Sequence, residues 1–225
     1  MCLSNSITLQ NYFISSEKPN NKLYKKKKYQ KYADNKNILC NFADMEYMKT
    51  DLEGVYILEP KVFGDSRGYF FEAFKQSEFD KNIGHVDFIQ DNESKSSYGV
   101  LRGLHYQKGE YSQAKLVRVI QGRVLDVVVD IRRKSSTFGK HLMVELSEDN
   151  KRQLFIPRGF AHGFLVLSDT AVFTYKVDNV YAPQAEASIR FDDSDIGISW
   201  PIAASEMLLS EKDMHASAFK DAEMF

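Results

Sequence analysis

Two of the five histidines lie in short segments that contain glycine and border strand-like runs. His105 follows Arg102-Gly103-Leu104, and His162 directly precedes Gly163. Glycine allows a backbone to approach a ligand closely, and histidine exchanges protons near neutral pH. The pattern favours a catalytic base at His105. From the pattern alone, a partly buried histidine that bonds to a neighbour explains each site equally well.

A metal site is a second functional interpretation of the two histidines. Cupin-type β-barrels often bind a metal through histidines and a carboxylate. Their motif commonly begins with two histidines one residue apart, but the second position after His105 is Gln107. Because one ligand is missing, the sequence argues against a bound metal.

Charged and aromatic side chains within the strand-like runs give further candidates. Arg102 and Lys115 flank His105. Such cations pair well with phosphate oxygens and would suit an anionic ligand such as a diphosphate, whereas a solvated outer strand face explains any one of them. Tyr175 is a candidate acid, because a phenol can protonate a carbanion when its surroundings lower its pKa. Packing is the alternative role for a tyrosine in a strand.

Short runs rich in Val, Ile, Phe and Tyr recur from Val55 onward and predict strands. The segment Gln121-Gly122-Arg123 is typical of a hairpin turn. Helical signal is confined to residues 76–82, where Ser77 is a candidate N-cap, and to about 205–222. The sequence therefore predicts a mainly β fold, a sandwich or barrel-like jelly roll with short peripheral helices. The predicted strands cover residues 55–58, 68–74, 115–120, 123–131, 141–146, 153–156, 163–167 and 171–177.

Length and charge divide the chain unequally. With 225 residues and 43% hydrophobic content, it can bury one sizeable core, and we expect a single domain over residues 45–225. Residues 1–44 carry eight lysines against three acidic residues, and we interpret them as a basic, disordered or peripheral extension. A phosphate- or nucleic-acid-binding arm and a true start near Met45 or Met48 are the alternatives. Since the remainder is net acidic, we expect no nucleic-acid partner.

The cysteines and the hydropathy pattern exclude further classes. Cys2 and Cys40 both lie within residues 1–44, so the rest of the chain has neither a disulfide framework nor a thiolate metal site. No apolar run approaches the roughly 20 residues of a membrane-spanning helix, and no secretory signal is evident. We therefore expect a cytoplasmic protein that does not enter a membrane.

A set of linked motifs carries a family resemblance. Over about residues 48–213 the sequence resembles the dTDP-4-dehydrorhamnose 3,5-epimerases of rhamnose biosynthesis. The resemblance implies a cupin-type jelly-roll β-barrel and a homodimer that exchanges strands between subunits. It also implies an isomerase that uses neither metal nor organic cofactor. The motifs are the segments 59–68, 90–92, 101–107, 127–132, 136–139, 156–164 and 209–213.

The resemblance also implies roles for individual residues. His105 would remove protons next to the C4 ketone, at C5 and C3 of dTDP-4-dehydro-6-deoxy-D-glucose, to give dTDP-4-dehydro-L-rhamnose. Asp213 would pair with this base, and Tyr175 would return a proton on the opposite ring face. Lys115 would lie near the developing enolate, where positive charge lowers the barrier. The residues implied in substrate binding are Arg67, Glu72, Gln90, Asp91, Asn92, Arg102, Lys115, His162, Glu186 and Lys212.

Two other functions are compatible with parts of this pattern. An epimerase acting at one centre, C3 or C5, of another deoxysugar nucleotide would carry the same base and acid. A non-catalytic cupin that binds sugar nucleotides belongs to a different class. The combination of His105, Asp213 and Tyr175 argues against a pure binding protein, because binding requires no base and acid.

Overall fold

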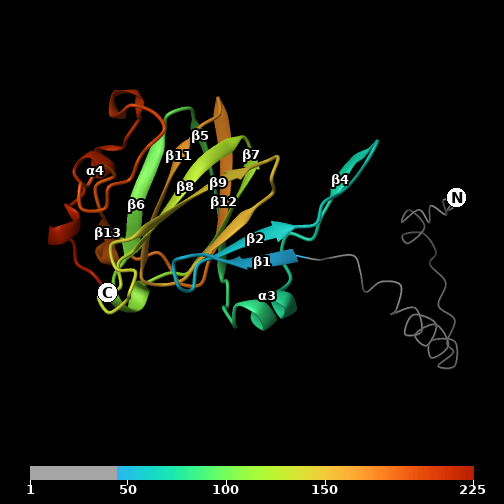
Figure 1. Cartoon of the computed structure of the whole chain (residues 1–225), viewed down its shortest axis with the longest axis horizontal. Coiled ribbons are helices and arrows are strands. Elements are labelled where there is room, and N and C mark those ends of the chain that lie inside the picture. The colour runs from blue at the N-terminus through green and yellow to red at the C-terminus, as the bar shows by residue number, and fades with distance from the viewer. Residues whose placement is uncertain (1–44) are drawn as a thin grey trace, which may run out of the picture. The chain divides into compact units, whose positions relative to one another are not determined.

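The computed structural model describes residues 45–225, and the predicted extension at residues 1–44 lies outside the described residues. Two antiparallel sheets face each other (Figure 1), which confirms the predicted jelly-roll class. The six-stranded sheet has the order β1 (Met45–Lys49), β2 (Tyr56–Pro60), β10 (Gln153–Ile156), β7 (Lys115–Gln121), β12 (Thr170–Val177), β5 (Gln90–Ser97). The five-stranded sheet has the order β13 (Glu186–Ser188), β6 (Leu101–Gln107), β11 (Phe160–Val166), β8 (Arg123–Asp130), β9 (His141–Ser147).

The main core lies between the two sheets and follows the two-residue period of the strands. In β8, Val124 and Val128 belong to this core, whereas Val127 and Val129 belong to a second cluster on the opposite face. Alternate side chains of a strand point to opposite faces, so an apolar run such as β8 is buried on both. The second cluster packs beneath the C-terminal residues, which lie beside β6 and β13 in Figure 1.

The predicted hairpin turn at Gln121-Gly122-Arg123 is wrong. The turn does connect β7 to β8, but β7 belongs to the six-stranded sheet and β8 to the five-stranded sheet. Gly122 has a φ of +78°, and a Cβ placed there would lie 2.0 Å from the carbonyl oxygen of Thr170. Glycine is therefore required where the chain crosses between sheets, and this local requirement resembles that of a hairpin.

The helix predicted over residues 76–82 is confirmed, whereas the helical prediction for about residues 205–222 is largely wrong. Helix α3 (Gln76–Asn82) has the predicted bounds, but its N-cap is Lys75 without a side-chain hydrogen bond, so the prediction of Ser77 was wrong. Residues 205–222 do not form one helix. Their backbone pairs elsewhere, with Leu208 donating to Gly99 and Ser217 donating to Ser188. Only short elements form there: the 3₁₀-helices η4 (Ala204–Glu206) and η5 (Phe219–Asp221) and the α-helix α4 (Glu211–Met214).

A two-stranded hairpin, β3 (Phe63–Asp65) and β4 (Gly68–Phe70), projects beyond the two sheets (Figure 1). The strand predicted over residues 68–74 is thus shorter than expected. The hairpin exposes apolar side chains, since Tyr69 and Phe70 are 59% and 63% exposed. Two further 3₁₀-helices, η2 (Gly109–Tyr111) and η3 (Pro183–Ala185), lie in loops.

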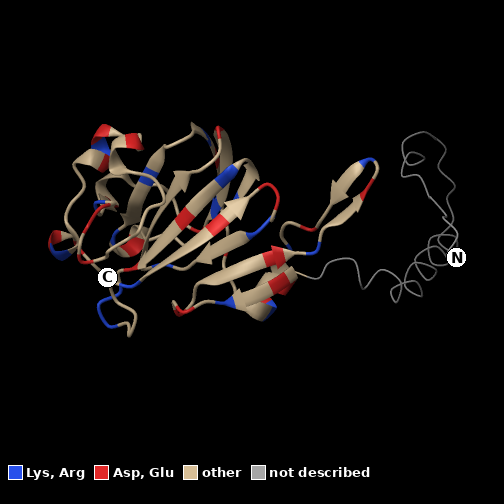
Figure 2. Cartoon of the chain, turned by 45° about the horizontal axis from the view of Figure 1, so that its top comes forward, with Lys and Arg blue, Asp and Glu red and all other residues tan. Residues whose placement is uncertain are grey.

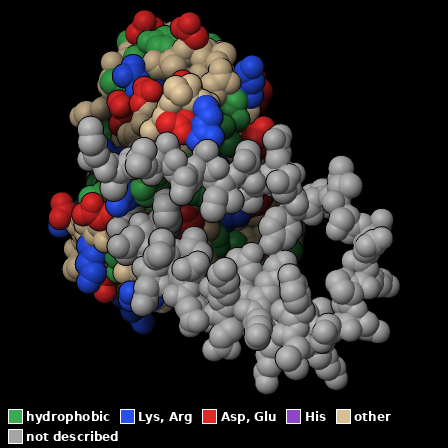
Figure 3. All heavy atoms as spheres, turned by 90° about the vertical axis from the view of Figure 1, so that its right-hand side faces the viewer, with side chains coloured by type: hydrophobic (Ala, Val, Ile, Leu, Met, Phe, Trp, Pro, Cys, Tyr) green, Lys and Arg blue, Asp and Glu red, His purple; other side chains and the backbone are tan. Residues whose placement is uncertain are grey.

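The described surface carries charges of both signs. Lysine and arginine are interspersed with aspartate and glutamate along the sheets and loops in Figure 2, and the coloured side chains in Figure 3 show the same mixture. None of the helices in residues 45–225 is long and apolar enough to cross a membrane.

Candidate active site

An irregularity between β6 and β11 places two functional side chains on the same face. His105 lies opposite His162, but Arg102 lies opposite Phe164, so three steps along β6 match two along β11. This is a β-bulge, in which one extra residue changes the facing of the strand. Without it, Arg102 and His105 would point to opposite faces. With it, both line one cavity.

Two glycines make this bulge possible. Gly103 has a φ of +138°, and a Cβ there would lie 2.5 Å from the Cα of Gly163. A Cβ on Gly163 would in turn lie 2.7 Å from the carbonyl oxygen of Arg102. The sequence suggested that these glycines let the backbone approach a ligand. In the structure they allow two strands to approach each other, which positions the neighbouring histidines, and Gly163 also lines the cavity.

His105 is joined to a buried carboxylate. Its Nε2 lies 2.5 Å from Oδ1 of Asp213, which is 3% exposed, while the imidazole itself is 30% exposed. Ser210, the N-cap of α4, donates from its hydroxyl to Oδ2 of Asp213 at 2.8 Å. Burial raises the pKa of Asp213, but the hydrogen bond and charge of His105, with Ser210 and Gly103, outweigh this and lower it. Asp213 is therefore an ionised partner that orients the imidazole.

His162 has a carboxylate partner of its own. Its Nε2 lies 3.0 Å from both oxygens of Asp126, and Asp126 is fully buried. Burial lowers the pKa of His162, and the positive charges of Lys115 and His105 act in the same direction, opposed by Asp126. His162 is therefore neutral at neutral pH. Asp126 was missed in the sequence, although a lone acidic residue at an inward position of an apolar strand marks it.

The opposite wall of the cavity comes from the six-stranded sheet. Burial lowers the pKa of Lys115 to about 8, opposed by the negative charges of Asp126 and Glu186. Burial raises the pKa of Tyr175, opposed by the positive charge of Arg102. The sequence interpretation required surroundings that lower the tyrosine's pKa, whereas burial keeps the phenol protonated. A protonated phenol is the form that a proton donor needs.

The cavity itself measures about 170 Å³. It is lined by Ser94, Arg102, His105, Lys115, His162, Gly163, Phe164, Phe173 and Tyr175. An adjoining cavity of about 300 Å³ shares Arg102 and His105 and is also lined by Ser210 and Asp213. Both members of the His105–Asp213 pair are thus accessible from this region, and the two sheets supply opposite walls.

Glu186 and Lys212 lie at the edge of the site next to Asp213. They form an ion pair that joins β13 to α4, and the hydroxyl of Tyr181 donates to Glu186 at 2.7 Å. Burial raises the pKa of Glu186, but its partners Lys212 and Tyr181, with the charge of His105, lower it overall. The ion pair therefore holds the helix that carries Asp213 against the sheet that carries His105.

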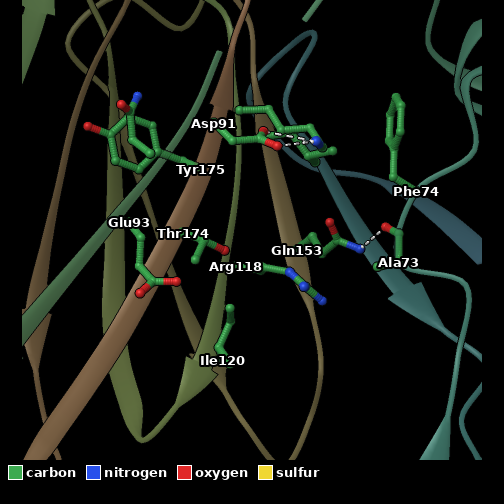
Figure 4. A pocket seen from close by; sticks show the side chains of 12 residues that line it. Ala73, Phe74, Asp91, Glu93, Arg118, Ile120, Gln153, Thr174 and Tyr175 are labelled. Atoms are coloured by element: carbon green, nitrogen blue, oxygen red, sulfur yellow. Dashed lines mark hydrogen bonds and ion pairs between the residues drawn. The ribbon is translucent and has the colours of Figure 1, made fainter.

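The alternation of side chains along strand β5 places Gln90 and Asn92 on one face of the sheet and Asp91 on the other. Gln90 donates to the side chain of Asn92 at 2.7 Å, and both lie on the same strand face as the cavity residue Ser94. Asp91 lies on the opposite face, where it pairs with Lys176 at 2.9 Å. Figure 4 shows the Asp91 ion pair, Arg118 and Gln153 beside a cavity of about 640 Å³, whose lining also includes Tyr175 and Asn92.

Arg67 and Glu72 are not among the residues that line the cavity. Arg67 lies at the turn of the β3–β4 hairpin, with its side chain 87% exposed and its guanidinium bonded to Asp65. Glu72 follows the same hairpin. Within one chain, the structure therefore does not bring these two predicted binding residues to His105.

Gln107 does not offer the missing metal ligand. Its amide nitrogen donates to the carbonyl oxygens of Tyr111 and Val180, at 2.7 and 3.0 Å. Its amide oxygen accepts from the backbone of Ala182 at 2.7 Å. The side chain fastens two loops to β6, and within residues 45–225 no group of three or more His, Cys, Asp or Glu side chains could hold a metal ion.

The comparisons with known proteins agree with this geometry. Residues 49–221 match the family model described as dTDP-4-dehydrorhamnose 3,5-epimerase. The enzyme of that name from Shigella flexneri is 54% identical over 182 residues, which cover 80% of this chain and 99% of the relative.

Solved structures extend the comparison. The dTDP-4-dehydrorhamnose 3,5-epimerase of Elizabethkingia anophelis is 57% identical, with a TM-score of 0.76, covering 79% of this chain and 97% of that one. A Legionella pneumophila dTDP-6-deoxy-D-glucose-3,5-epimerase in complex with dTDP-4-keto-L-rhamnose is 45% identical, with a TM-score of 0.77, covering 80% and 95%. The chain belongs to the dTDP-4-dehydrorhamnose 3,5-epimerase family.

Proposed function

We propose that this chain is an isomerase that converts dTDP-4-dehydro-6-deoxy-D-glucose into dTDP-4-dehydro-L-rhamnose, a step of dTDP-L-rhamnose biosynthesis. One observation carries the proposal: the His105–Asp213 pair lies on one wall of a cavity whose opposite wall carries Lys115 and Tyr175. Base and acid on facing walls are what inversion at carbon requires, because the proton leaves one ring face and returns to the other.

His105 is the base of the proposed reaction. Its Nε2 is engaged by Asp213, and no other described residue is bonded to the ring, so Nδ1 is available to the substrate. A proton next to a ketone is acidic enough for a positioned imidazole to remove it. Asp213 stabilises the imidazolium that forms, since an ionised carboxylate lies beside the developing positive charge.

Lys115 and Tyr175 complete the chemistry. Removal of the proton moves negative charge onto the ketone oxygen, and the buried ammonium of Lys115 stabilises this oxyanion. Tyr175 then donates its hydroxyl proton to the opposite face of the carbon. The positive charge of Arg102 opposes the rise in the tyrosine's pKa and so favours the phenolate left behind.

The polar groups around the cavity suit a nucleotide sugar. Arg102, held by a hydrogen bond to Ser96 at 3.2 Å, is a guanidinium suited to phosphate or sugar oxygens. Gln90, Asn92, His162, Glu186 and Lys212 provide further polar contacts. The Legionella relative holds dTDP-4-keto-L-rhamnose, which supports a ligand of this class.

The number of inverted centres is the direct test. The purified chain is incubated with dTDP-4-dehydro-6-deoxy-D-glucose in deuterated water, and the product is analysed by NMR. We expect deuterium and inverted configuration at both C3 and C5. Deuterium at one centre alone would indicate the single-centre alternative, and no exchange at all would refute the epimerase.

We further propose a homodimer in which the β3–β4 hairpin contributes to the site of the second copy. The hairpin extends beyond its own sheets, and Tyr69 and Phe70 remain exposed on it. It carries Arg67 and is followed by Glu72, the two predicted binding residues that do not line the cavity of their own chain. A second copy would bury the aromatic side chains and bring these charges to a substrate.

Mixed dimers test this arrangement. Co-expression of His105→Ala with Arg67→Ala gives some dimers that contain one copy of each variant. If Arg67 acts across the interface, one of the two sites in such a dimer has both an intact His105 and an intact Arg67. If Arg67 acts within its own chain, neither site does. We expect each variant alone to be weakly active and the mixture to regain activity. Failure of the mixture to exceed its parents, or a monomer by light scattering, would refute the proposal.

We also propose that residues 45–225 act as one catalytic domain, because every candidate site residue lies between Arg67 and Asp213. A chain that begins at Met45 should retain kcat, and a large loss would contradict this boundary. Residence in the cytoplasm stays a prediction, which cell fractionation would check.

A further inference from the structure

Asp126 is a buried acidic residue for which the reaction described above gives no role. It lies at an inward position of β8 between Val124 and Val128, both of which belong to the apolar core. Its side chain is fully buried, and its only hydrogen-bond partner among the described residues is His162. A carboxylate in such a place is costly unless it is hydrogen-bonded, so its presence calls for an explanation in terms of His162.

The geometry of this contact indicates which ring nitrogen of His162 carries the proton. Both oxygens of Asp126 lie 3.0 Å from the same nitrogen, Nε2, which is the geometry of one N–H shared between two acceptors. An ionised carboxylate only accepts hydrogen bonds, and a neutral imidazole has one donor and one acceptor nitrogen. If Nε2 is the donor, Nδ1 is the acceptor.

The acceptor nitrogen faces the cavity. No described residue is hydrogen-bonded to Nδ1 of His162, and the described residues include no buried polar side-chain atom without a partner. Nδ1 is therefore accessible, and His162 lines the cavity together with Phe173, on which its ring stacks at 6.1 Å between centroids.

The cavity has a shortage of acceptors. Arg102 and Lys115 only donate hydrogen bonds, and Tyr175 has a protonated hydroxyl. A hexose brings hydroxyl groups that need acceptors as well as donors. Apart from the hydroxyls of Ser94 and Tyr175 and the nitrogen of His105 that acts as the base, Nδ1 of His162 is the side-chain acceptor that the cavity lining offers.

His105 and His162 have the same construction but different surroundings. In each, Nε2 is hydrogen-bonded to an aspartate and no described residue is bonded to Nδ1. The side chain of His105 is 30% exposed, however, and that of His162 only 9%. A proton on His162 would add a third positive charge to a cavity that Arg102 and Lys115 already line. This favours a hydrogen-bond acceptor at His162 and leaves proton removal to His105.

We propose that Asp126 is a positioning residue: it holds His162 in the tautomer with the proton on Nε2, so that Nδ1 accepts a hydrogen bond from a hydroxyl group of the sugar. The sugar contact rests on the proposed function, whereas the tautomer belongs to the free protein and does not depend on it.

NMR of the imidazole nitrogens tests the tautomer in the full chain without substrate. The signals of His162 are identified by their loss in His162→Gln, and the 15N shifts distinguish a protonated from an unprotonated ring nitrogen. We expect Nε2 protonated and Nδ1 unprotonated at neutral pH. The opposite pattern, or a doubly protonated ring, would overturn the proposal even if no variant of Asp126 folds.

Asp126→Asn tests the consequence for the substrate. The amide can donate to Nε2, which moves the proton of His162 to Nδ1 and removes the acceptor. We expect the NMR pattern to reverse and KM to rise about tenfold, the worth of one hydrogen bond, with a much smaller change in kcat because ground state and transition state share the contact.

Asp130→Asn is the matched control. Asp130 lies on the same strand and is equally buried, but it binds Arg132, Ser135 and Thr137 instead of a cavity residue. The Asp130→Asn substitution should lower the melting temperature and leave both the His162 tautomer and KM unchanged. Equal effects of the two substitutions on KM would show a merely structural role and overturn the proposal. An inactive wild type with the expected tautomer would refute the proposed reaction instead.

Discussion

His105 and His162 lie directly opposite each other on neighbouring antiparallel strands, and each is bonded through Nε2 to its own aspartate. The aspartates are 108 residues away for His105 and 36 residues away for His162. Two similar pairs thus meet from distant parts of the chain. Their different burial separates a solvent-accessible base from a buried neutral imidazole.

Asp213→Asn is expected to reduce kcat about 10²–10⁴-fold, the range of a lost general base. The amide keeps the size of the side chain but carries no charge to stabilise the imidazolium, and it can hold the wrong tautomer of His105. Steady-state kinetics give the reduction. Ser210→Ala, which removes only the hydroxyl bonded to Asp213, should have a much smaller effect, and equal losses would contradict this view.

Tyr175→Phe should separate proton exchange from inversion. Without the phenol, His105 can still remove a proton and return it to the same face, so the substrate should take up deuterium from the solvent. Inverted product should form about 10²–10⁴-fold more slowly, because the acid on the other face is missing. NMR in deuterated water follows both events. Loss of exchange together with inversion would show that Tyr175 acts before proton removal.

The pH dependence of kcat/KM should show a fall as the pH rises through about 8. Burial lowers the pKa of Lys115 to this value, and only the charged form stabilises the oxyanion. Lys115→Arg keeps a charge at higher pH, because guanidinium stays protonated. Its profile should lack this fall, whatever its absolute rate, and an unchanged fall would assign the titration to another group.

Lys115 should also lower the stability of the fold at neutral pH. Its pKa lies below the ordinary 10.5 in the folded state, so the unfolded chain binds more protons between about pH 8 and 10.5. Stability therefore rises with pH across this window, and the penalty is fully present below it. Lys115→Met should stabilise the protein at pH 7 by on the order of 1–3 kcal/mol while abolishing turnover. Urea unfolding at pH 7 and pH 10.5 checks this, and the gain should vanish at the higher pH.

Gly103→Ala should destabilise the protein by about 1–3 kcal/mol or more, because the backbone conformation is unfavourable for alanine and the new Cβ meets Gly163 at 2.5 Å. Since the bulge orients Arg102 and His105, activity should fall in the molecules that still fold. Gly64→Ala, whose Cβ would approach nothing closer than 3.7 Å, is the control for thermal unfolding. Similar melting temperatures for both variants would contradict the role of the bulge.

The sequence by itself determined the class of fold and the chemical identity of the site. Apolar runs of β-branched residues such as β8 can be satisfied only by burial on both faces, so two packed sheets were predictable from local pattern. Linked motifs around His105, Tyr175 and Asp213 indicated the family, because each motif combines residue types that one reaction needs.

Only the tertiary structure decided which residues meet. Three features depend on contacts between remote parts of the chain. They are the crossing at Gly122 into the other sheet, the pairing of Leu208 and Ser217 with distant segments, and the bulge at Gly103. The same is true of Asp126, whose partner lies on the neighbouring strand, and of Asp91, which the two-residue period turns away from Gln90 and Asn92. Local propensity carries no information on such contacts, because their free energy arises only once the sheets have packed.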